Sequence, residues 1–227
     1  MASATAEALN TLCAGLILIA AFAMVATRQV QGVVRFFVIQ SLLLSASCFL
    51  LAYSRSSVHL WALGAITIGA KVIAIPWVLR RLLPDDFYER REISQAVNIP
   101  ASLLLALLLV VVAEFLTGPL VATAKDSVIR INLPLGLAGV LIAVWSLVAR
   151  REALPQLIGI LAMENGAFLA GIAIASELPI IAELAVAMDV VLIAVVVGLL
   201  TRSIRKELGT TVAAGLAELK EEPVSWR

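Results

Sequence analysis

The sequence is poor in the residues from which soluble active sites and metal centres are usually built. Its 227 residues include one histidine and two cysteines, and 15% of them are charged. Cys13 and Cys48 lie in separate apolar segments, without the short Cys/His spacing of a metal or cluster site. Glycine-rich nucleotide motifs are absent, and a net charge of +1 gives no reason to expect nucleic acid. We therefore expect no cofactor or metal in this chain.

Apolar residues dominate instead. They make up 62% of the chain, and its mean hydropathy is +1.04. Soluble domains are about 45–50% apolar and about 25% charged, so this chain departs from them in both respects. Several apolar runs reach the roughly 18 residues that a membrane-spanning helix needs. The first run lacks the basic segment that precedes a cleavable signal, and we interpret it as the first span. The composition thus predicts an all-α polytopic membrane protein.

We predict seven membrane-spanning helices, each long enough to cross a hydrocarbon core of about 30 Å at 1.5 Å per residue. Prolines support these boundaries, because Pro100, Pro155 and Pro179 open helices. Pro76 and Pro134 fall inside spans, where neighbouring helices can satisfy the freed carbonyls. The predicted spans are residues 7–27, 31–53, 57–80, 99–117, 128–149, 153–176 and 179–202.

Basic residues alternate between the two sets of loops. One set is rich in them and the other holds three, which by the positive-inside rule puts the N-terminus outside and the C-terminus inside. We divide the chain into a three-helix half, a connector helix, a second three-helix half and a cytoplasmic tail, at 1–98, 99–127, 128–202 and 203–227. The inner set comprises Arg28, Arg35, Arg80, Arg81, Arg90, Arg91, Arg150, Arg151, Arg202, Arg205 and Lys206, and the outer set Arg55, Lys125 and Arg130.

The two halves share short segments of sequence. Ala14-Gly-Leu-Ile-Leu-Ile-Ala-Ala and Ala26-Thr-Arg28 in the first half resemble Ala138-Gly-Val-Leu-Ile-Ala-Val and Val148-Ala-Arg150 in the second. Both halves would enter from the same side, as a parallel repeat requires. A true duplication and a shared apolar bias explain the match equally well.

Three ionisable residues, Lys71, Glu164 and Asp189, lie near the middle of predicted spans. A lysine or aspartate there costs about 2.5–3.5 kcal/mol on insertion scales, whereas each Leu, Ile, Val or Phe returns about 0.3–0.6 kcal/mol. Such residues usually face protein or a wet cavity and serve proton relays, ion pathways or helix pairing. They are our main candidates for a proton or ion relay, and the alternatives are a fixed structural ion pair or misplaced span boundaries.

Other polar residues are secondary candidates. Gln40 is near mid-span and could bridge a water chain, although an interhelical hydrogen bond is the simpler role. His59 lies near the outer end of the third span, where an interfacial histidine is ordinary and an entry or exit group for the path is the alternative. Glu183 could extend a path from Asp189. We place Glu114 near the outer end of the fourth span, within reach of the headgroups.

The second half carries an ordered set of motifs. It runs through Asn132-Leu-Pro-Leu-Gly-Leu-Ala-Gly, Val148-Ala-Arg-Arg151, Leu157-Ile-Gly-Ile-Leu-Ala-Met-Glu-Asn165, Ala185-Val-Ala-Met-Asp189 and Gly198-Leu-Leu-Thr-Arg202. This set resembles the small K subunit of respiratory complex I and the K-like subunits of cation/proton antiporters. In that family an arginine pair follows the first of three spans, and each of the next two carries a central carboxylate. Asp189 occupies the second carboxylate position, whereas Glu164 lies one turn after the first, which Leu161 holds here.

A K-like half preceded by four spans resembles component E of hydrogenase-4 and of related formate hydrogenlyase-type membrane hydrogenases. The resemblance implies a non-catalytic subunit of a prokaryotic plasma membrane complex that couples redox chemistry in its partners to proton or sodium translocation. The implied partners are antiporter-like membrane subunits, a subunit like H of complex I and, indirectly, soluble [NiFe] or iron–sulfur subunits. A stand-alone secondary transporter and a purely structural scaffold remain the alternatives.

Overall fold

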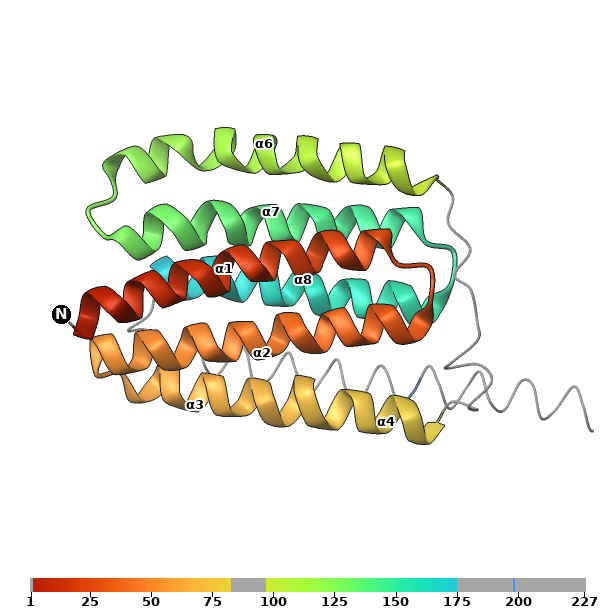
Figure 1. The fold of residues 1–227 in the computed structure, drawn as a ribbon, viewed down its shortest axis with the longest axis horizontal. Helices are drawn as coiled ribbons and strands as arrows, with labels where there is room; N and C mark the ends of the chain where they lie inside the picture. Colours follow the sequence, from red (N-terminus) through yellow and green to blue (C-terminus); the bar gives the residue numbers. More distant parts are fainter. Residues whose placement is uncertain (1, 83–96, 175–197, 199–227) are drawn as a thin grey trace, which may run out of the picture.

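The computed structural model describes residues 2–82, 97–174 and 198, and these form long helices that run side by side along one axis (Figure 1). The third span is built from three consecutive segments, α3, the π-helical η1 and α4. The helices are α1 (Ala2–Ala26), α2 (Val30–Arg55), α3 (Val58–Thr67), η1 (Ile68–Ala74), α4 (Ile75–Leu82), α6 (Ile99–Thr123), α7 (Ser127–Ala149) and α8 (Ala153–Ile174).

Among the described residues, six helices are long and apolar enough to cross a membrane, when α3, η1 and α4 count as one. They coincide with the first six predicted spans, and the predicted helix 179–202 lies outside the described residues apart from Gly198. The fourth span is longer than predicted. It was expected to end at residue 117, but α6 continues through Pro119 to Thr123.

Polar residues define the helix ends. The Asn98 side chain accepts a hydrogen bond from the Ala101 amide at 3.1 Å and caps α6, whose first turn contains Pro100. Asp126 caps α7 in the same way, by accepting from the Val128 amide at 2.9 Å. Ser56 ends α2 in the left-handed conformation, with φ of 50°.

Helices α7 and α8 approach each other closely through two glycines. A Cβ atom added to Gly136 would lie 2.5 Å from the Ala170 amide nitrogen, and one added to Gly166 would lie 2.7 Å from the Val140 nitrogen. Glycine permits this approach because it has no side chain, and small residues are the usual contact residues between membrane helices. The close contact fixes α8, which carries Glu164, against the rest of the bundle.

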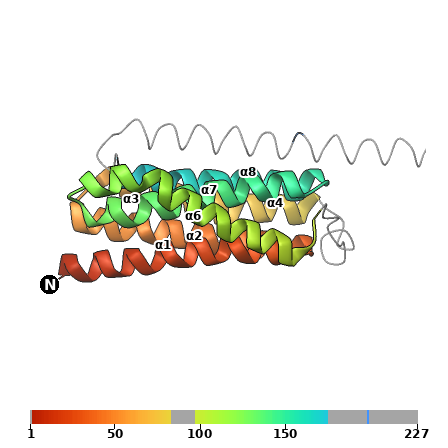
Figure 2. The ribbon, with the colours of Figure 1, turned by 90° about the horizontal axis from the view of Figure 1, so that it is seen from above.

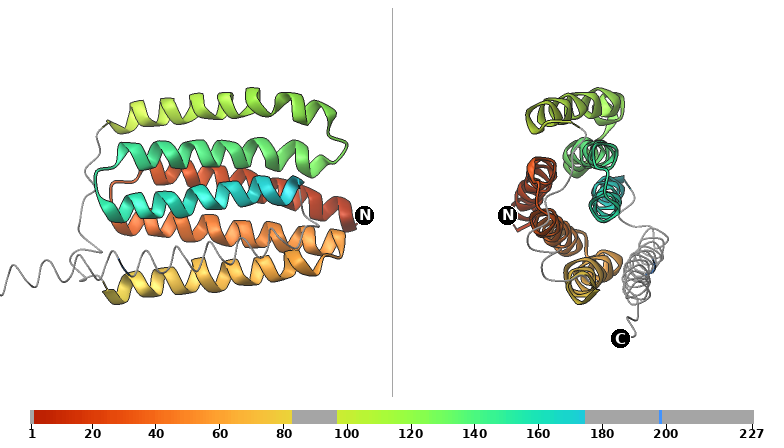
Figure 3. Two further views of the ribbon diagram at one scale, coloured as in Figure 1. Left: turned by 180° about the vertical axis from the view of Figure 1, so that it is seen from behind. Right: turned by 90° about the vertical axis from the view of Figure 1, so that its right-hand side faces the viewer.

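Helix α6 lies at the edge of the bundle. Seen end-on, it sits beyond α7 and away from α3 and α4 (Figure 3), and seen from above it crosses in front of the other helices (Figure 2). Its buried residues are small or polar, Ser102, Ala106, Ala113 and Thr117. Most of its large apolar side chains point away from the described bundle.

Candidate functional site

A buried ion pair joins η1 to α8. The Lys71 Nζ lies 3.0 Å from the Glu164 Oε2, and the two side chains are 0% and 6% exposed. Lys71 is the fourteenth of 24 residues in its span, and Glu164 the eleventh of 21, so both lie near mid-depth. Two residues that the sequence marked separately as relay candidates are therefore in direct contact. Asp189, the third candidate, and Glu183 lie outside the described residues.

Lys71 has two further partners on α8. Its ammonium donates a hydrogen bond to the Asn165 Oδ1 at 3.1 Å and lies 4.7 Å from the centre of the Phe168 ring. Phe168 is one helical turn beyond Glu164, so both project from the same side of α8. A cation above an aromatic face is attracted by the ring electrons, most strongly where water is excluded. The charge of Lys71 is thus stabilised by a carboxylate, an amide oxygen and an aromatic ring.

Asn165 connects this pair to α2. Its Nδ2 donates to the Ser41 Oγ at 2.9 Å and to the Gln40 Oε1 at 3.3 Å. Gln40, Ser41 and Asn165 are fully buried. The Gln40 Nε2 finds no acceptor within the part of the chain that the structure describes, so the network retains one unused donor. Gln40 makes the interhelical hydrogen bond considered in the sequence analysis, whereas Asn165 and Ser41 were not singled out as site residues.

The backbone of η1 helps to position Lys71. Proline has no N–H and its ring crowds the carbonyl four residues earlier, so Pro76 interferes with a regular helix at Val72. Just before Pro76, the Ile75 amide bonds to the Ala70 carbonyl, five residues back, which widens the helix into a π segment over Ile68–Ala74. Single π turns of this kind often occur at functional sites, because they rotate one side chain out of helical register.

His59 does not join the network. It is exposed at the second position of α3, twelve residues before Lys71, or about 18 Å along the helix axis. Its position at the end of the span fits the interfacial role that the sequence suggested.

A second buried polar cluster ties α1, α2 and α7 together. The Asn10 Nδ2 donates to the Asn132 Oδ1 at 3.0 Å, and the Ser47 Oγ donates to the Asn10 Oδ1 at 2.6 Å. All three side chains are buried and none carries a charge. Interhelical hydrogen bonds of this kind hold membrane helices in a fixed register. We assign the cluster a structural role.

Arg150 is buried at the turn between α7 and α8. Its guanidinium donates to the Met24 carbonyl at the end of α1, while Gln156 donates to the Arg150 carbonyl at 2.7 Å. Burial lowers the pKa of Arg150 to about 10, so the side chain stays charged at neutral pH. Arg151, its neighbour in the predicted inner loop, is exposed. The arginine pair therefore combines a structural contact with a surface charge.

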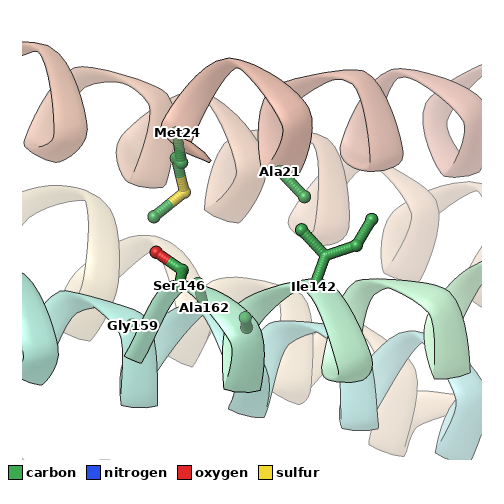
Figure 4. A pocket seen from close by; sticks show the side chains of 7 residues that line it. Ala21, Met24, Ile142, Ser146, Gly159 and Ala162 are labelled. Atoms are coloured by element: carbon green, nitrogen blue, oxygen red, sulfur yellow. The ribbon is translucent and has the colours of Figure 1, made fainter. Parts of the chain in front are cut away.

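A small cavity of about 10 Å³ lies between α1, α7 and α8 (Figure 4). The Ser146 hydroxyl turns into it toward Met24, and has no partner among the described residues. A cavity of this size has room for about one water molecule, so it cannot hold a substrate. The cavity is lined by Ala21, Met24, Ile142, Ala143, Ser146, Gly159 and Ala162.

The long apolar helices and the charges inside the bundle define a multi-pass membrane protein. The chain is 26% identical to hydrogenase-4 component E of Escherichia coli strain K12 over 215 residues, which cover 91% of this chain and 95% of that protein. The same values hold for component E of Shigella flexneri. It is also 28% identical over 221 residues, 97% of this chain and the whole of the relative, to the uncharacterized protein Rv0085 of Mycobacterium tuberculosis.

No family model and no solved structure matches the chain. The similarity to component E, which covers nearly the whole of both chains, confirms the resemblance expected from the sequence. The resemblance of its second half to the K subunit of complex I stays a prediction.

Proposed function

We propose that the chain is a non-catalytic membrane subunit of a hydrogenase-4-like, energy-converting complex in a prokaryotic plasma membrane. In this complex it helps couple redox chemistry in partner subunits to the translocation of protons or sodium ions. Two lines support the proposal: the full-length similarity to component E, and the Lys71–Glu164 pair near mid-depth. The pair carries the argument, because ionisable residues buried inside membrane proteins are rare and usually functional.

The chemistry of the pair suits a coupling role. While Glu164 is ionised, it neutralises Lys71 across 3.0 Å. When Glu164 takes up a proton, or when another charge attracts Lys71, the ammonium still has Asn165 and the Phe168 ring as partners. The site therefore accommodates two charge states without leaving the cation alone in an apolar interior. Asp189 is the predicted next group of the relay.

The partners in this proposal are antiporter-like membrane subunits and a subunit like H of complex I. Soluble subunits with [NiFe] or iron–sulfur centres carry out the redox reaction, and no cofactor resides in this chain. Purification of the tagged full-length chain in mild detergent, with mass spectrometry of the proteins that accompany it, tests this assembly. A chain that purifies alone would contradict the proposal and favour the stand-alone transporter.

The role of the pair is tested in membrane vesicles that contain the assembled complex. We expect Glu164→Gln to preserve assembly and to lower ion translocation per electron transferred by tenfold or more, since glutamine keeps the shape but not the charge. Glu7→Gln is the matched control, because Glu7 is a half-buried carboxylate near the start of α1. It accepts a hydrogen bond from the Ser127 hydroxyl at 2.7 Å, which a glutamine oxygen can also accept. If translocation per electron were unchanged in Glu164→Gln, the pair would be structural and the scaffold alternative would replace the relay.

A further inference from the structure

Glu114 is a carboxylate on the outside of the bundle near mid-depth. It is exposed, and it is the sixteenth of 25 residues in α6. The expected position near the end of the span assumed a helix that stops at residue 117. Because α6 continues to Thr123, Glu114 lies only about 4.5 Å from the middle of the helix.

One stripe of α6 surrounds this carboxylate. Leu107, Val111, Glu114 and Gly118 follow one another at intervals of four, three and four residues, so they line the same side of the helix. Leu107 and Val111 are 56% and 59% exposed. A Cβ atom added to Gly118 would meet nothing within 4 Å, so another backbone can approach closely beside Glu114.

Lipid is a poor neighbour for this stripe. An exposed apolar face is ordinary for a membrane helix, but a charged side chain facing hydrocarbon near mid-depth is strongly unfavourable. Within the described residues, the Glu114 carboxylate makes no ion pair and no side-chain hydrogen bond. Because the Glu114 carboxylate is exposed near mid-depth, we expect a cation from outside the described bundle to pair with it.

A second copy of the chain is a poor source of that cation. Away from the span ends, the described helices contain one basic residue, Lys71, which is fully buried and bound to Glu164 and Asn165. A symmetric pair of α6 helices would bring two carboxylates toward the same surface, where like charges repel.

We propose that the stripe formed by Leu107, Val111, Glu114 and Gly118 is the docking site for a transmembrane helix of a different membrane subunit, which places a lysine or arginine opposite Glu114. This inference rests on the proposed membership in a membrane complex, and it names the surface through which the chain joins that complex.

Site-specific photo-cross-linking in the complete complex tests the proposal. A photoreactive amino acid at Val111 should cross-link to one membrane subunit, at a peptide with a lysine or arginine within one helical turn of the linked residue. The matched control is the same probe at Ile73, which is 61% exposed and is the sixteenth of 24 residues in its span. A cross-link to lipid alone, to a second copy, to residues 175–227 of the same chain, or to a peptide without a basic residue would overturn the proposal.

Charge variants separate docking from folding. We expect Glu114→Leu to leave the thermal stability of the isolated chain unchanged or raised, and to lower the Val111 cross-link at least tenfold. Glu114→Lys should have the same effect on the cross-link, and reversal of the partner's basic residue to glutamate should restore it. Unchanged cross-linking in Glu114→Lys would overturn this proposal alone if the complex is still recovered, whereas no complex with the wild-type chain would overturn the proposed function itself.

Discussion

At the scale of single residues, the central feature is that the buried ammonium of Lys71 has several partners. Lys71 contacts a carboxylate, an amide oxygen and an aromatic ring. Asn165, which supplies the amide oxygen, also donates a hydrogen bond to Ser41 of α2. A buried ion pair gives little net stability compared with apolar residues of the same volume, but removing the lysine deprives the buried carboxylate of its counter-charge. Net stability therefore does not explain why the pair is present, which supports the proposed coupling role.

Because the two charges compensate each other, we expect substitutions of Lys71 and Glu164 to have non-additive effects on the free energy of unfolding. Lys71→Met should lower the free energy of unfolding by about 3–5 kcal/mol, because Glu164 then loses its cation. The double variant Lys71→Met, Glu164→Leu should be more stable than Lys71→Met, since no buried charge remains. Unfolding of the purified variants in detergent micelles measures both values. Additive effects of the two substitutions would show that the groups do not interact.

Part of this site could be predicted from the sequence. Lys71 and Glu164 were recognisable because a charge stands out in an apolar run. Asn165 and Ser41 carry no charge, so they were not recognised as site residues. The adjacency of Asn165 to Glu164 was the available signal. That these residues meet could not be derived, since Lys71 and Asn165 are separated by 94 positions in the chain.

At the scale of helices, two backbone features determine where the side chains of the site lie. The π segment η1 orients Lys71, and the glycine contact between α7 and α8 sets the position of Glu164 and Asn165. Both depend on residues without function of their own, Pro76 in the first case and Gly136 with Gly166 in the second. The sequence marked Pro76 as lying within a span, but not the change in helix type before it.

The glycine contact yields a matched pair of variants. Gly166→Ala should lower the free energy of unfolding by about 1–3 kcal/mol, because the new methyl group would lie 2.7 Å from the Val140 nitrogen and must push α7 and α8 apart. Gly159→Ala is the control on the same helix, since its Cβ would meet atoms no closer than 3.7 Å. Thermal unfolding of both variants in detergent compares them, and equal losses would contradict this packing argument.

At the scale of the whole molecule, the predicted inner and outer charges that fall in the described residues lie at opposite ends of the bundle. The inner residues Arg90, Arg91, Arg202, Arg205 and Lys206 lie outside the described residues. Arg35 and Arg80 line one groove between α2 and the third span, and Arg150 meets the end of α1. The predicted outer residue Arg55 pairs instead with Asp126, at the turn between α6 and α7. This arrangement agrees with alternating loops, whereas the orientation of the protein in the membrane stays a prediction.

Labelling of single cysteines determines that orientation. In a background with Cys13 and Cys48 replaced by alanine, we expect Ser56→Cys to react with a membrane-impermeant maleimide in intact cells. Gln29→Cys should react only after the membrane is permeabilised, because it lies in the loop predicted to be inside. Both native residues are exposed at helix ends, so access to the reagent is comparable. The reverse pattern would invert the predicted topology.

Hydropathy alone was enough to predict the class of protein, the first six spans and the residues most costly to bury. The reason is that a bilayer requires long apolar helices, whose backbone groups bond internally, and makes every central charge conspicuous. Which faces of the helices are in contact became clear from the packing in the structure. In a membrane the lipid-facing and buried sides of a helix are both apolar, so hydropathy cannot distinguish them. Only the packing could bring Lys71 to Glu164 and leave Glu114 on the outside of α6.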